Sequence, residues 1–268
     1  MQLADAVVVV TGGASGIGRC LAEGFAQRGA RGVVVADTNL EWAERVAGEI
    51  GAAAIAVACD VGDPEQIMSL VARTDGAFGP VDVFCSNAGY SDPAPGDLNS
   101  SPADFRRITD VNLLAHVWAA QAVVPSMIER GGGYLLQTIS AAALITGPSG
   151  PGYTLTKHGA LGFAEWMALN YGGRGVRVSC LCPNAVYTGM FGRQFDDNEP
   201  PPSDGPLGEV MMPEDVAAQV LTAMETDEPF LISPHARVRD SFRRKADDYD
   251  AWIERTRGRL QWMREQTT

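Results

Sequence analysis

The residues best suited to chemistry in this chain are Ser140, Tyr153 and Lys157. The surrounding segment predicts a strand that ends near Ser140, a loop rich in glycine and proline, and a helix that carries Tyr153 and Lys157. Because residues four apart share a helix face, the ammonium would lie beside the phenol and lower its pKa, which is about 10 in free tyrosine. The spacing predicts a tyrosine that transfers protons near neutral pH, with a seryl hydroxyl to hold the reacting oxygen.

A glycine-rich segment near the N-terminus predicts a binding site for the cofactor that this chemistry needs. The first apolar run leads into Thr11-Gly12-Gly13-Ala14-Ser15-Gly16-Ile17-Gly18 and then into a helical pattern. Glycine at positions 12, 16 and 18 permits a tight turn, close approach of the backbone to a pyrophosphate, and close packing of helix on strand. This segment therefore predicts a dinucleotide site.

The second apolar run ends at Asp37, nineteen residues after Gly18. A carboxylate there can accept hydrogen bonds from the adenosine ribose and would repel a phosphate on that ribose, which predicts NAD rather than NADP. Two alternatives stay open. Asp37 could cap the next helix, although Thr38 or Asn39 could also do so, and Arg19 could approach a ribose phosphate.

Strand-like and helix-like patterns alternate along the whole chain. The apolar runs lack in-out alternation, as parallel strands covered on both faces require. They occupy residues 7–10, 33–36, 55–58, 81–85, 134–139, 176–181 and 230–233, and the helical patterns occupy 16–28, 40–50, 64–78, 102–130, 153–171 and 213–226. This order predicts an α/β, doubly wound Rossmann-type fold with a seven-stranded parallel sheet and helices on both faces.

With these motifs in order, the chain resembles the short-chain dehydrogenase/reductase family over about residues 3 to 190. The resemblance rests on TGGASGIG, Asp37, Ser86-Asn87-Ala88-Gly89 and the trio with its YxxxK spacing. It implies that Asn112 is a fourth catalytic residue, which bends its helix so that a carbonyl holds a water next to Lys157. Without the resemblance, Asn112 reads as a buried polar residue that is satisfied locally.

The resemblance also extends the cofactor site. It implies that Asp60 and Val61 neighbour the adenine, that Asn87 to Gly89 form a backbone wall, and that Val186 and Thr188 hold the nicotinamide carboxamide. The predicted cofactor contacts are Gly12, Ser15, Gly16, Ile17, Gly18, Asp37, Asp60, Val61, Asn87, Ala88, Gly89, Tyr153, Lys157, Pro183, Val186 and Thr188. The predicted catalytic set is Asn112, Ser140, Tyr153 and Lys157, and no metal ligands are predicted.

The chain departs from the family pattern in three places. Asn184 replaces a usual glycine, which asparagine tolerates because it accepts unusual backbone angles, and Ser86 replaces a frequent asparagine. Residues 235–268 form a divergent extension that continues as a charged, tryptophan-bearing helix. We expect residues 1–268 to form a single dinucleotide-binding catalytic domain, with residues 190–212 as a lid loop over the substrate.

Composition limits the other classes of function. The net charge of −12 argues against nucleic-acid and anionic-membrane partners, and the basic residues 237–245 are interpreted as a solvated helix face. The N-terminus lacks a signal-like apolar run, no stretch of about 18 apolar residues occurs, and the five cysteines lack metal-ligand spacing. These features predict a cytoplasmic protein without a metal.

The predicted function is reversible hydride transfer between NAD and a hydrophobic secondary alcohol or ketone, with Tyr153 as general acid and base. Alternatives are a non-catalytic NAD-binding regulatory protein and an NADP-dependent carbonyl reductase. Apart from any contribution of the divergent tail, the substrate pocket is expected to include Ala141–Leu144, Pro148–Gly152, Tyr187 and the 190–212 loop, with Tyr90 and Met211 as additions and no basic cluster near these positions. Apolar residues on several faces of 102–130 and 153–171, including Trp118 and Trp166, predict a homodimer or homotetramer.

Overall fold

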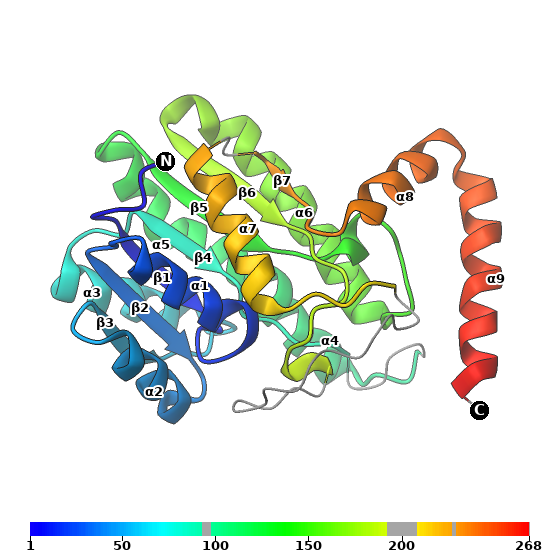
Figure 1. The fold of residues 1–268 in the computed structure, drawn as a ribbon, viewed down its shortest axis with the longest axis horizontal. Helices are drawn as coiled ribbons and strands as arrows, with labels where there is room; N and C mark the ends of the chain where they lie inside the picture. Colours follow the sequence, from blue (N-terminus) through cyan, green and yellow to red (C-terminus); the bar gives the residue numbers. More distant parts are fainter. Residues whose placement is uncertain (93–97, 192–207, 227–228, 268) are drawn as a thin grey trace.

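The computed structural model describes residues 1–92, 98–191, 208–226 and 229–267. Its seven parallel strands have the order β3-β2-β1-β4-β5-β6-β7, as Figure 1 shows. The strands are β1 (Val7–Thr11), β2 (Gly32–Asp37), β3 (Ala54–Ala58), β4 (Val83–Ser86), β5 (Gly133–Thr138), β6 (Val176–Leu181) and β7 (Leu231–Ile232). The predicted Rossmann-type fold is confirmed, and the chain order reverses between β1 and β4, where such folds bind their ligands.

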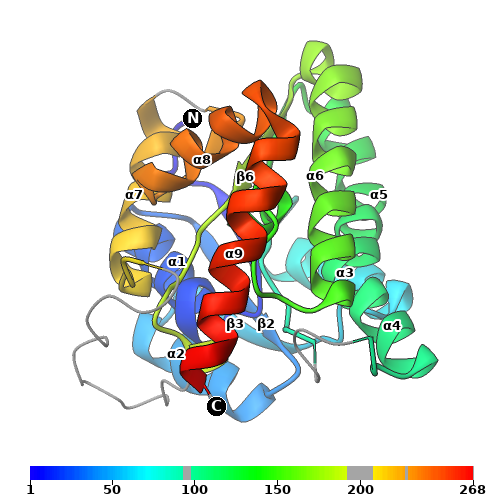
Figure 2. The same cartoon turned by 90° about the vertical axis from the view of Figure 1, so that its right-hand side faces the viewer.

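Helices cover both faces of the sheet (Figure 2). The helices are α1 (Gly16–Gln27), α2 (Leu40–Ile50), α3 (Pro64–Phe78), α4 (Pro102–Thr109), α5 (Ala115–Glu129), α6 (Pro151–Tyr171), α7 (Pro213–Thr226), α8 (Ala236–Asp247) and α9 (Tyr249–Thr267). Neighbouring strand residues belong to different cores: Val8 and Val10 pack with α1, α2 and α7, whereas Val9 packs with α3, α5 and α6. Both faces of the sheet are therefore buried, which explains the continuous apolar runs.

Two predicted helices are interrupted. Residues 102–130 form α4 and α5 around a π-helical segment, Asp110–Leu114. The tail forms two helices instead of one, because Asp248 leaves helical geometry with φ −150° and ψ 94°. The wider π-helical turn and the break at Asp248 both redirect side chains, and both adjoin the candidate site described below.

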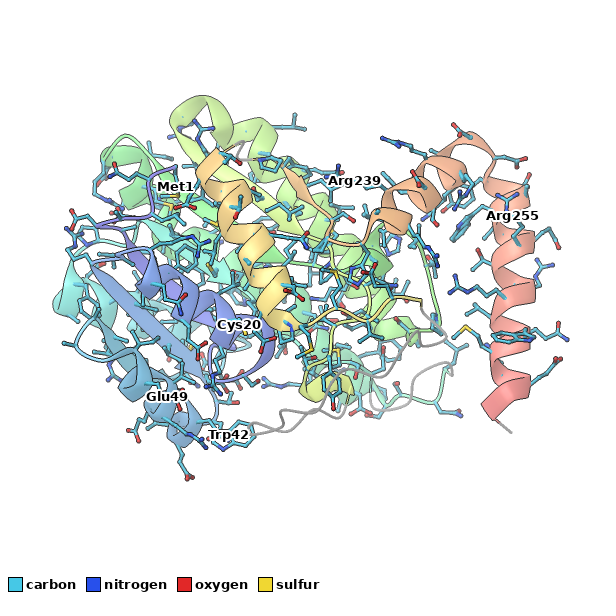
Figure 3. The ribbon with its side chains drawn as sticks, in the orientation of Figure 1. Met1, Cys20, Trp42, Glu49, Arg239 and Arg255 are labelled. Atoms are coloured by element: carbon cyan, nitrogen blue, oxygen red, sulfur yellow. The ribbon has the colours of Figure 1, made fainter. Side chains whose placement is uncertain are left out.

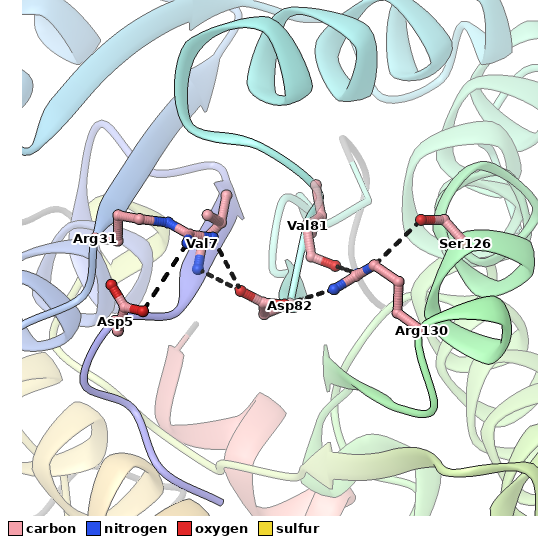
Figure 4. A network of polar contacts seen from close by, with 7 residues as sticks. All are labelled: Asp5, Val7, Arg31, Val81, Asp82, Ser126 and Arg130. Carbon is pink, nitrogen blue, oxygen red and sulfur yellow. Dashed lines mark hydrogen bonds and ion pairs between the residues drawn. The ribbon is translucent and has the colours of Figure 1, made fainter.

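A polar network closes the amino ends of the strands, on the side of the sheet opposite the glycine loop (Figure 4). The Asp82 carboxylate accepts a hydrogen bond from the Val7 N–H at 2.9 Å and pairs with Arg130 at 2.8 Å, while Arg130 also donates to the Val81 carbonyl. Arg31 approaches Asp82 and Asp5 more loosely, at 3.8 and 3.9 Å. The network joins β1, β4 and the end of α5 at the edge of the sheet opposite the glycine loop.

The segment Pro102–Glu129 has the length and apolar composition of a membrane span, and half of its most apolar window is buried in the fold. Buried α5 side chains belong to the core cluster that also contains α3 and α6 residues. A core helix of a globular domain passes the same composition test. The apolar character of this segment is accounted for by packing.

The expected lid loop lies largely outside the described residues, since 192–207 are not described. Its two ends are visible. Met190 belongs to a short 3₁₀ turn, and Met211 forms a parallel bridge with Val186 that includes a hydrogen bond from the Tyr187 N–H to the Met211 carbonyl. The lid therefore stays a prediction.

Candidate active site

A cavity of about 910 Å³ lies at the carboxyl ends of the strands and reaches from the glycine loop to α9. Of the predicted catalytic and cofactor residues, all line this cavity except Gly18 and Asn112. Those two lie behind its wall: Gly18 and Asn112 are both buried. Residues far apart in the sequence, from Gly12 to Thr188, therefore line one cavity.

Sterics explain why glycine occupies two positions of the first loop and of the start of α1. Gly12 has a φ of +62°, and a Cβ there would lie 2.9 Å from the Ala88 Cα. A Cβ at Gly18 would collide with the Gly12 carbonyl oxygen. Larger residues would push the turn away from α1, so the backbone donors of the loop stay open to a phosphate only with glycine at these positions.

The Asp37 carboxylate is held at the end of β2. It accepts hydrogen bonds from the Ala14 N–H at 3.1 Å and the Asn39 N–H at 3.0 Å. The α2 cap is Asn39, whose side chain accepts from the Trp42 N–H, so capping α2 does not require Asp37. Arg19 pairs with Glu23 and Glu49, both at 2.7 Å, which neutralises the cation that could have met a ribose phosphate.

Asn87 joins three strand ends beneath the cofactor pocket. Its amide donates to the Thr11 carbonyl at 3.1 Å and accepts from the Thr138 hydroxyl at 3.0 Å. The backbone N–H groups of Asn87 and Ala88 both donate to the Thr11 hydroxyl. The Asn87–Gly89 segment, predicted as a wall of the site, is fixed to β1 and β5 by these bonds.

Ser140, Tyr153 and Lys157 converge on the middle of the cavity. The Ser140 hydroxyl accepts from the Ala142 N–H at 3.1 Å and hydrogen-bonds to the Tyr153 phenol. The buried Lys157 ammonium lies 5.6 Å from the Tyr153 ring centroid and donates to the Thr138 carbonyl at 3.1 Å. One hydroxyl, one phenol and one ammonium thus face the same space.

Burial is the main cause of the pKa shifts of Tyr153 and Lys157. Desolvation raises the pKa of Tyr153 above its ordinary value, and the hydrogen bond with Ser140 opposes the shift. Burial also lowers the pKa of Lys157 to about 8. The expected lowering of the Tyr153 pKa by Lys157 is therefore wrong for this arrangement, because removing phenolate and ammonium from water disfavours both charges.

Asn112 sits in the π-helical segment with no exposed surface. Its side chain donates to the Tyr90 carbonyl at 2.8 Å and accepts from the Tyr90 N–H at 3.1 Å. The helix is irregular at Asn112, as the family resemblance implies. The hydrogen bonds of the Asn112 side chain are also made within the protein, as expected for a buried polar residue. A Cβ on Gly89 would lie 3.1 Å from the Asn112 Oδ1, so Asn112 also supports the wall of the cavity.

Asp92, which the sequence did not single out, holds the start of the Tyr153 helix. Its buried carboxylate accepts from the Gly152 N–H at 3.1 Å and from the Tyr153 N–H at 2.7 Å. Gly150, at the N-cap of α6, has no side chain to serve these donors, and a Cβ there would collide with Asp92. Gly-Pro-Gly at residues 150–152 was the available signal, since it leaves the helix start without a cap of its own.

The tail is fastened to the site by two buried residues. The His235 Nδ1 accepts from the Asn184 N–H at 3.1 Å, and its Nε2–H donates to the Ala185 carbonyl at 3.1 Å. The Lys245 ammonium donates to the Leu144 carbonyl at 3.0 Å. Lys245 is 7% exposed, so the interpretation of residues 237–245 as a wholly solvated face is wrong at this position.

Other substrate-pocket expectations need correction. Tyr187 and Met211 do not line the cavity, because Tyr187 is buried and both belong to the bridge with Val186; Tyr90 does line it. Asn184 keeps a negative φ, so it adopts no glycine-like geometry. The divergent tail, whose contribution the expectation left open, adds Arg244, Arg255 and Arg259 to the cavity wall.

Comparison of the sequence and the fold with known proteins shows what this chain is similar to. The family model described as short chain dehydrogenase matches residues 6–199. The chain is 37% identical over 250 residues to 1-deoxy-11-beta-hydroxypentalenate dehydrogenase of Streptomyces exfoliatus. The alignment covers 90% of this chain and 89% of the relative. The chain is 34% identical to cyclohexanol dehydrogenase of an Acinetobacter species, covering 84% of this chain and 90% of that one.

A solved structure agrees with them. The short-chain dehydrogenase/reductase of Burkholderia phymatum, solved in complex with NAD, matches with a TM-score of 0.81 and 27% identity over 94% of this chain and 96% of that chain. The fold and the site define a nicotinamide-dependent oxidoreductase acting on CH–OH groups. The chain belongs to the short-chain dehydrogenase/reductase family.

Proposed function

We propose that this chain is an NAD-dependent dehydrogenase that interconverts a secondary alcohol with a hydrophobic skeleton and its ketone. The observation that carries the proposal is the convergence of Ser140, Tyr153 and Lys157 on a cavity that is continuous with Asp37 and the glycine loop. Apolar residues such as Ile145 and Pro148 line the region next to the trio. The relatives named as cyclohexanol and hydroxypentalenate dehydrogenases support a cyclic substrate.

The glycine loop, Asp37 and residues 183–188 fit a dinucleotide, because the positions that touch it carry no side chain or a carboxylate suited to ribose hydroxyls. When bound, the nicotinamide supplies the hydride acceptor for alcohol oxidation. NAD is favoured over NADP since Asp37 would repel a ribose phosphate and Arg19 is occupied by Glu23 and Glu49. Residues 60–61 and 87–89 would complete the cofactor site.

The chain's own residues manage the proton and the substrate oxygen. In oxidation, the Tyr153 phenolate takes the hydroxyl proton, and in reduction the phenol returns it. Ser140 donates a hydrogen bond to the same oxygen and orients it. The Lys157 ammonium donates one hydrogen bond to the Thr138 carbonyl, and its other N–H groups would donate to the nicotinamide ribose. Asn112 positions the cavity wall next to Lys157 through its hydrogen bond to the Tyr90 carbonyl.

The test is NADH formation from NAD with a panel of cyclic secondary alcohols that includes cyclohexanol. We expect turnover, and a loss of kcat by about 10²- to 10⁴-fold in Tyr153→Phe, which removes the proton acceptor. No turnover of any alcohol, together with measurable NAD binding by calorimetry, would instead identify a non-catalytic NAD-binding protein.

The same assay tests cofactor choice. Replacing the carboxylate in Asp37→Ser should raise kcat/KM for NADP relative to NAD by at least about tenfold, because it removes the repulsion of a ribose phosphate. Glu44→Gln, which changes an exposed carboxylate of α2 that does not line the cavity, is the matched control with an unchanged ratio. A wild-type enzyme that prefers NADP would favour the carbonyl reductase alternative.

A further inference from the structure

The indole of Trp252 is a part of the cavity wall that comes from the divergent tail. Among the α9 residues whose burial is described, Trp252 is the only buried one, at 8% exposure, and it lines the cavity. Thr256, Leu260 and Met263 line the cavity further along the same face of the helix. Trp262 does not line it and is 55% exposed. The first turn of α9 is therefore the part of this helix that packs most closely on its surroundings.

Two neighbouring side chains fix the Trp252 indole. The Lys245 ammonium lies over it, 4.8 Å from its ring centroid, and the Tyr249 ring meets it at 5.6 Å and an angle of 62°. A cation over an aromatic face is attracted by the ring quadrupole, and the attraction is stronger where water is excluded. Lys245 is 7% exposed, so this contact is shielded from water and holds the indole in place.

Lys245 also ties the indole to the segment that follows Ser140. Its ammonium donates to the Leu144 carbonyl at 3.0 Å. Leu144 closes the short 3₁₀ turn Ala141–Ala143, whose N-cap is Ser140, because its N–H donates to the first carbonyl of that turn at 3.0 Å. The Ser140 hydroxyl and the Trp252 indole are therefore linked through one hydrogen-bonded turn and one buried lysine.

This link lies at the end of the cavity that is proposed for the substrate. Asp37 marks the end proposed for the adenosine, where α2 follows β2. Figure 3 shows that α9, on which Arg255 is labelled, lies across the molecule from α2. Ile145, directly after Leu144, lines the cavity as well. A ligand that reaches from Ser140 toward α9 therefore meets apolar side chains and then the indole.

We propose that Trp252 closes the substrate end of the cavity and packs against the skeleton of the alcohol, and that Lys245 is the positioning residue that holds it there. This inference rests on the proposed function and narrows the substrate class to cyclic alcohols that fit between the Ser140 hydroxyl and the indole. A flat indole makes the largest apolar contact with a ring that lies against it. Because Lys245 keeps the indole from moving aside, a longer skeleton is excluded.

The experiment measures kcat/KM with NAD for cyclopentanol, cyclohexanol, decahydro-2-naphthol and androsterone, a series of increasing ring skeleton. We expect the wild type to prefer one of the three smaller alcohols. In Trp252→Ala, kcat/KM for the preferred alcohol should fall at least about tenfold, and the ratio of the next larger alcohol to it should rise at least about tenfold. The substitution removes the apolar contact and lengthens the cavity. Trp252→Leu, which keeps an apolar side chain for packing, should shift the ratio in the same direction by less.

The matched control is Trp262→Ala, which removes an exposed indole of the same helix that does not line the cavity. Its kcat/KM for each alcohol should stay within about twofold of the wild type, as should the KM for NAD in every variant. Turnover with an unchanged preference in Trp252→Ala and Trp252→Leu would overturn the role of Trp252 while leaving the proposed function intact. A wild type that prefers androsterone would also overturn it, because the indole would then not limit the skeleton. No turnover of any alcohol would reject both proposals.

A double-mutant cycle tests the positioning role of Lys245. Lys245→Met keeps an aliphatic side chain and removes the ammonium that lies over the indole, so the preference should move toward the larger alcohol, as in Trp252→Ala. Added to Trp252→Ala, it should change the ratio by less than about threefold further, because a residue that acts through Trp252 has nothing left to position. Fully additive effects on the ratio would show that Lys245 acts independently of the indole and would overturn this role.

Discussion

At the scale of single residues, the protonation of Tyr153 decides how the enzyme responds to pH. Burial raises the pKa of the phenol, so the proton acceptor needed for oxidation is scarce at neutral pH. The proton donor needed for reduction is abundant there. The site is thus biased toward ketone reduction near neutrality and toward alcohol oxidation in alkaline solution.

We predict opposite pH profiles for the two directions. The kcat/KM for oxidation should rise with pH from about 7 upward with a slope near one on logarithmic axes, whereas that for reduction should stay flat and fall only in alkali. Ser140→Ala removes the hydrogen bond that opposes the pKa shift, so its oxidation profile should move to higher pH. Steady-state rates in both directions across a pH series provide the measurement, and an oxidation profile that is already flat at pH 7 contradicts the prediction.

At the scale of elements, the start of α6 is the point where packing and chemistry meet. Gly152 and Tyr153 donate their backbone N–H groups to the buried Asp92 carboxylate, which also places a negative charge at the positive end of the helix. Because Tyr153 lies in this first turn, fraying of the helix displaces the phenol.

Asp92→Ala should therefore lower stability by about 1–2 kcal/mol and lower kcat about tenfold, with the KM for NAD within about twofold of the wild type. The matched control is Asp104→Ala, which removes the carboxylate of the capping box of α4. The control should lose stability without the selective loss of kcat. Equal effects on kcat in the two variants would show that Asp92 acts through stability alone, as measured by denaturant titration beside kinetics.

The elements differ in how far local sequence determines them. The bounds of α2 and α3 follow from local signals, because Asn39 and Asp63 cap their starts and glycines follow their ends. The trio and the glycine loop follow from spacing and residue type. The places of Asp92 and Lys245 do not, since each depends on a partner far along the chain, 60 residues away for Gly152 and 101 residues away for Leu144.

The break at Asp248 was missed for a similar reason. The residues 236–267 are charged and mostly helix-forming, and the one local signal is Asp248, whose side chain accepts a hydrogen bond from the Ala251 N–H at 2.9 Å and so caps the start of α9. The Lys245 ammonium lies between the Tyr249 and Trp252 rings, at 5.4 and 4.8 Å from their centroids. An aspartate cap alone does not mark a break within a charged helical pattern, and the burial of Lys245 becomes evident only in the fold.

At the scale of the whole molecule, the outer face of α6 indicates further assembly. Leu155, Trp166 and Leu169 are 66%, 51% and 85% exposed, and their spacing places them along one side of the helix. Apolar side chains gathered in this way mark contact surfaces. We propose that this face joins two copies of the chain.

The predicted dimer or tetramer should dissociate to monomers in Trp166→Glu/Leu169→Glu, because the substitutions bury charge in the interface. Met68→Glu alters a 59% exposed apolar residue on α3 and is the control that should keep its oligomeric state. Light scattering coupled to gel filtration measures the mass. A monomeric wild type would refute this assembly.

The attachment of the tail has a consequence for how new specificities arise. Described contacts of α8 and α9 with the body include the hydrogen bonds of His235 and Lys245 to the Ala185 and Leu144 carbonyls, which follow the carboxyl ends of β6 and β5. We therefore expect that the α9 residues on the cavity wall can be substituted as a group while His235 and Lys245 are kept. Libraries confined to positions 255, 256, 259, 260 and 263 should redirect the enzyme among alcohols while leaving cofactor use and the sheet unaltered.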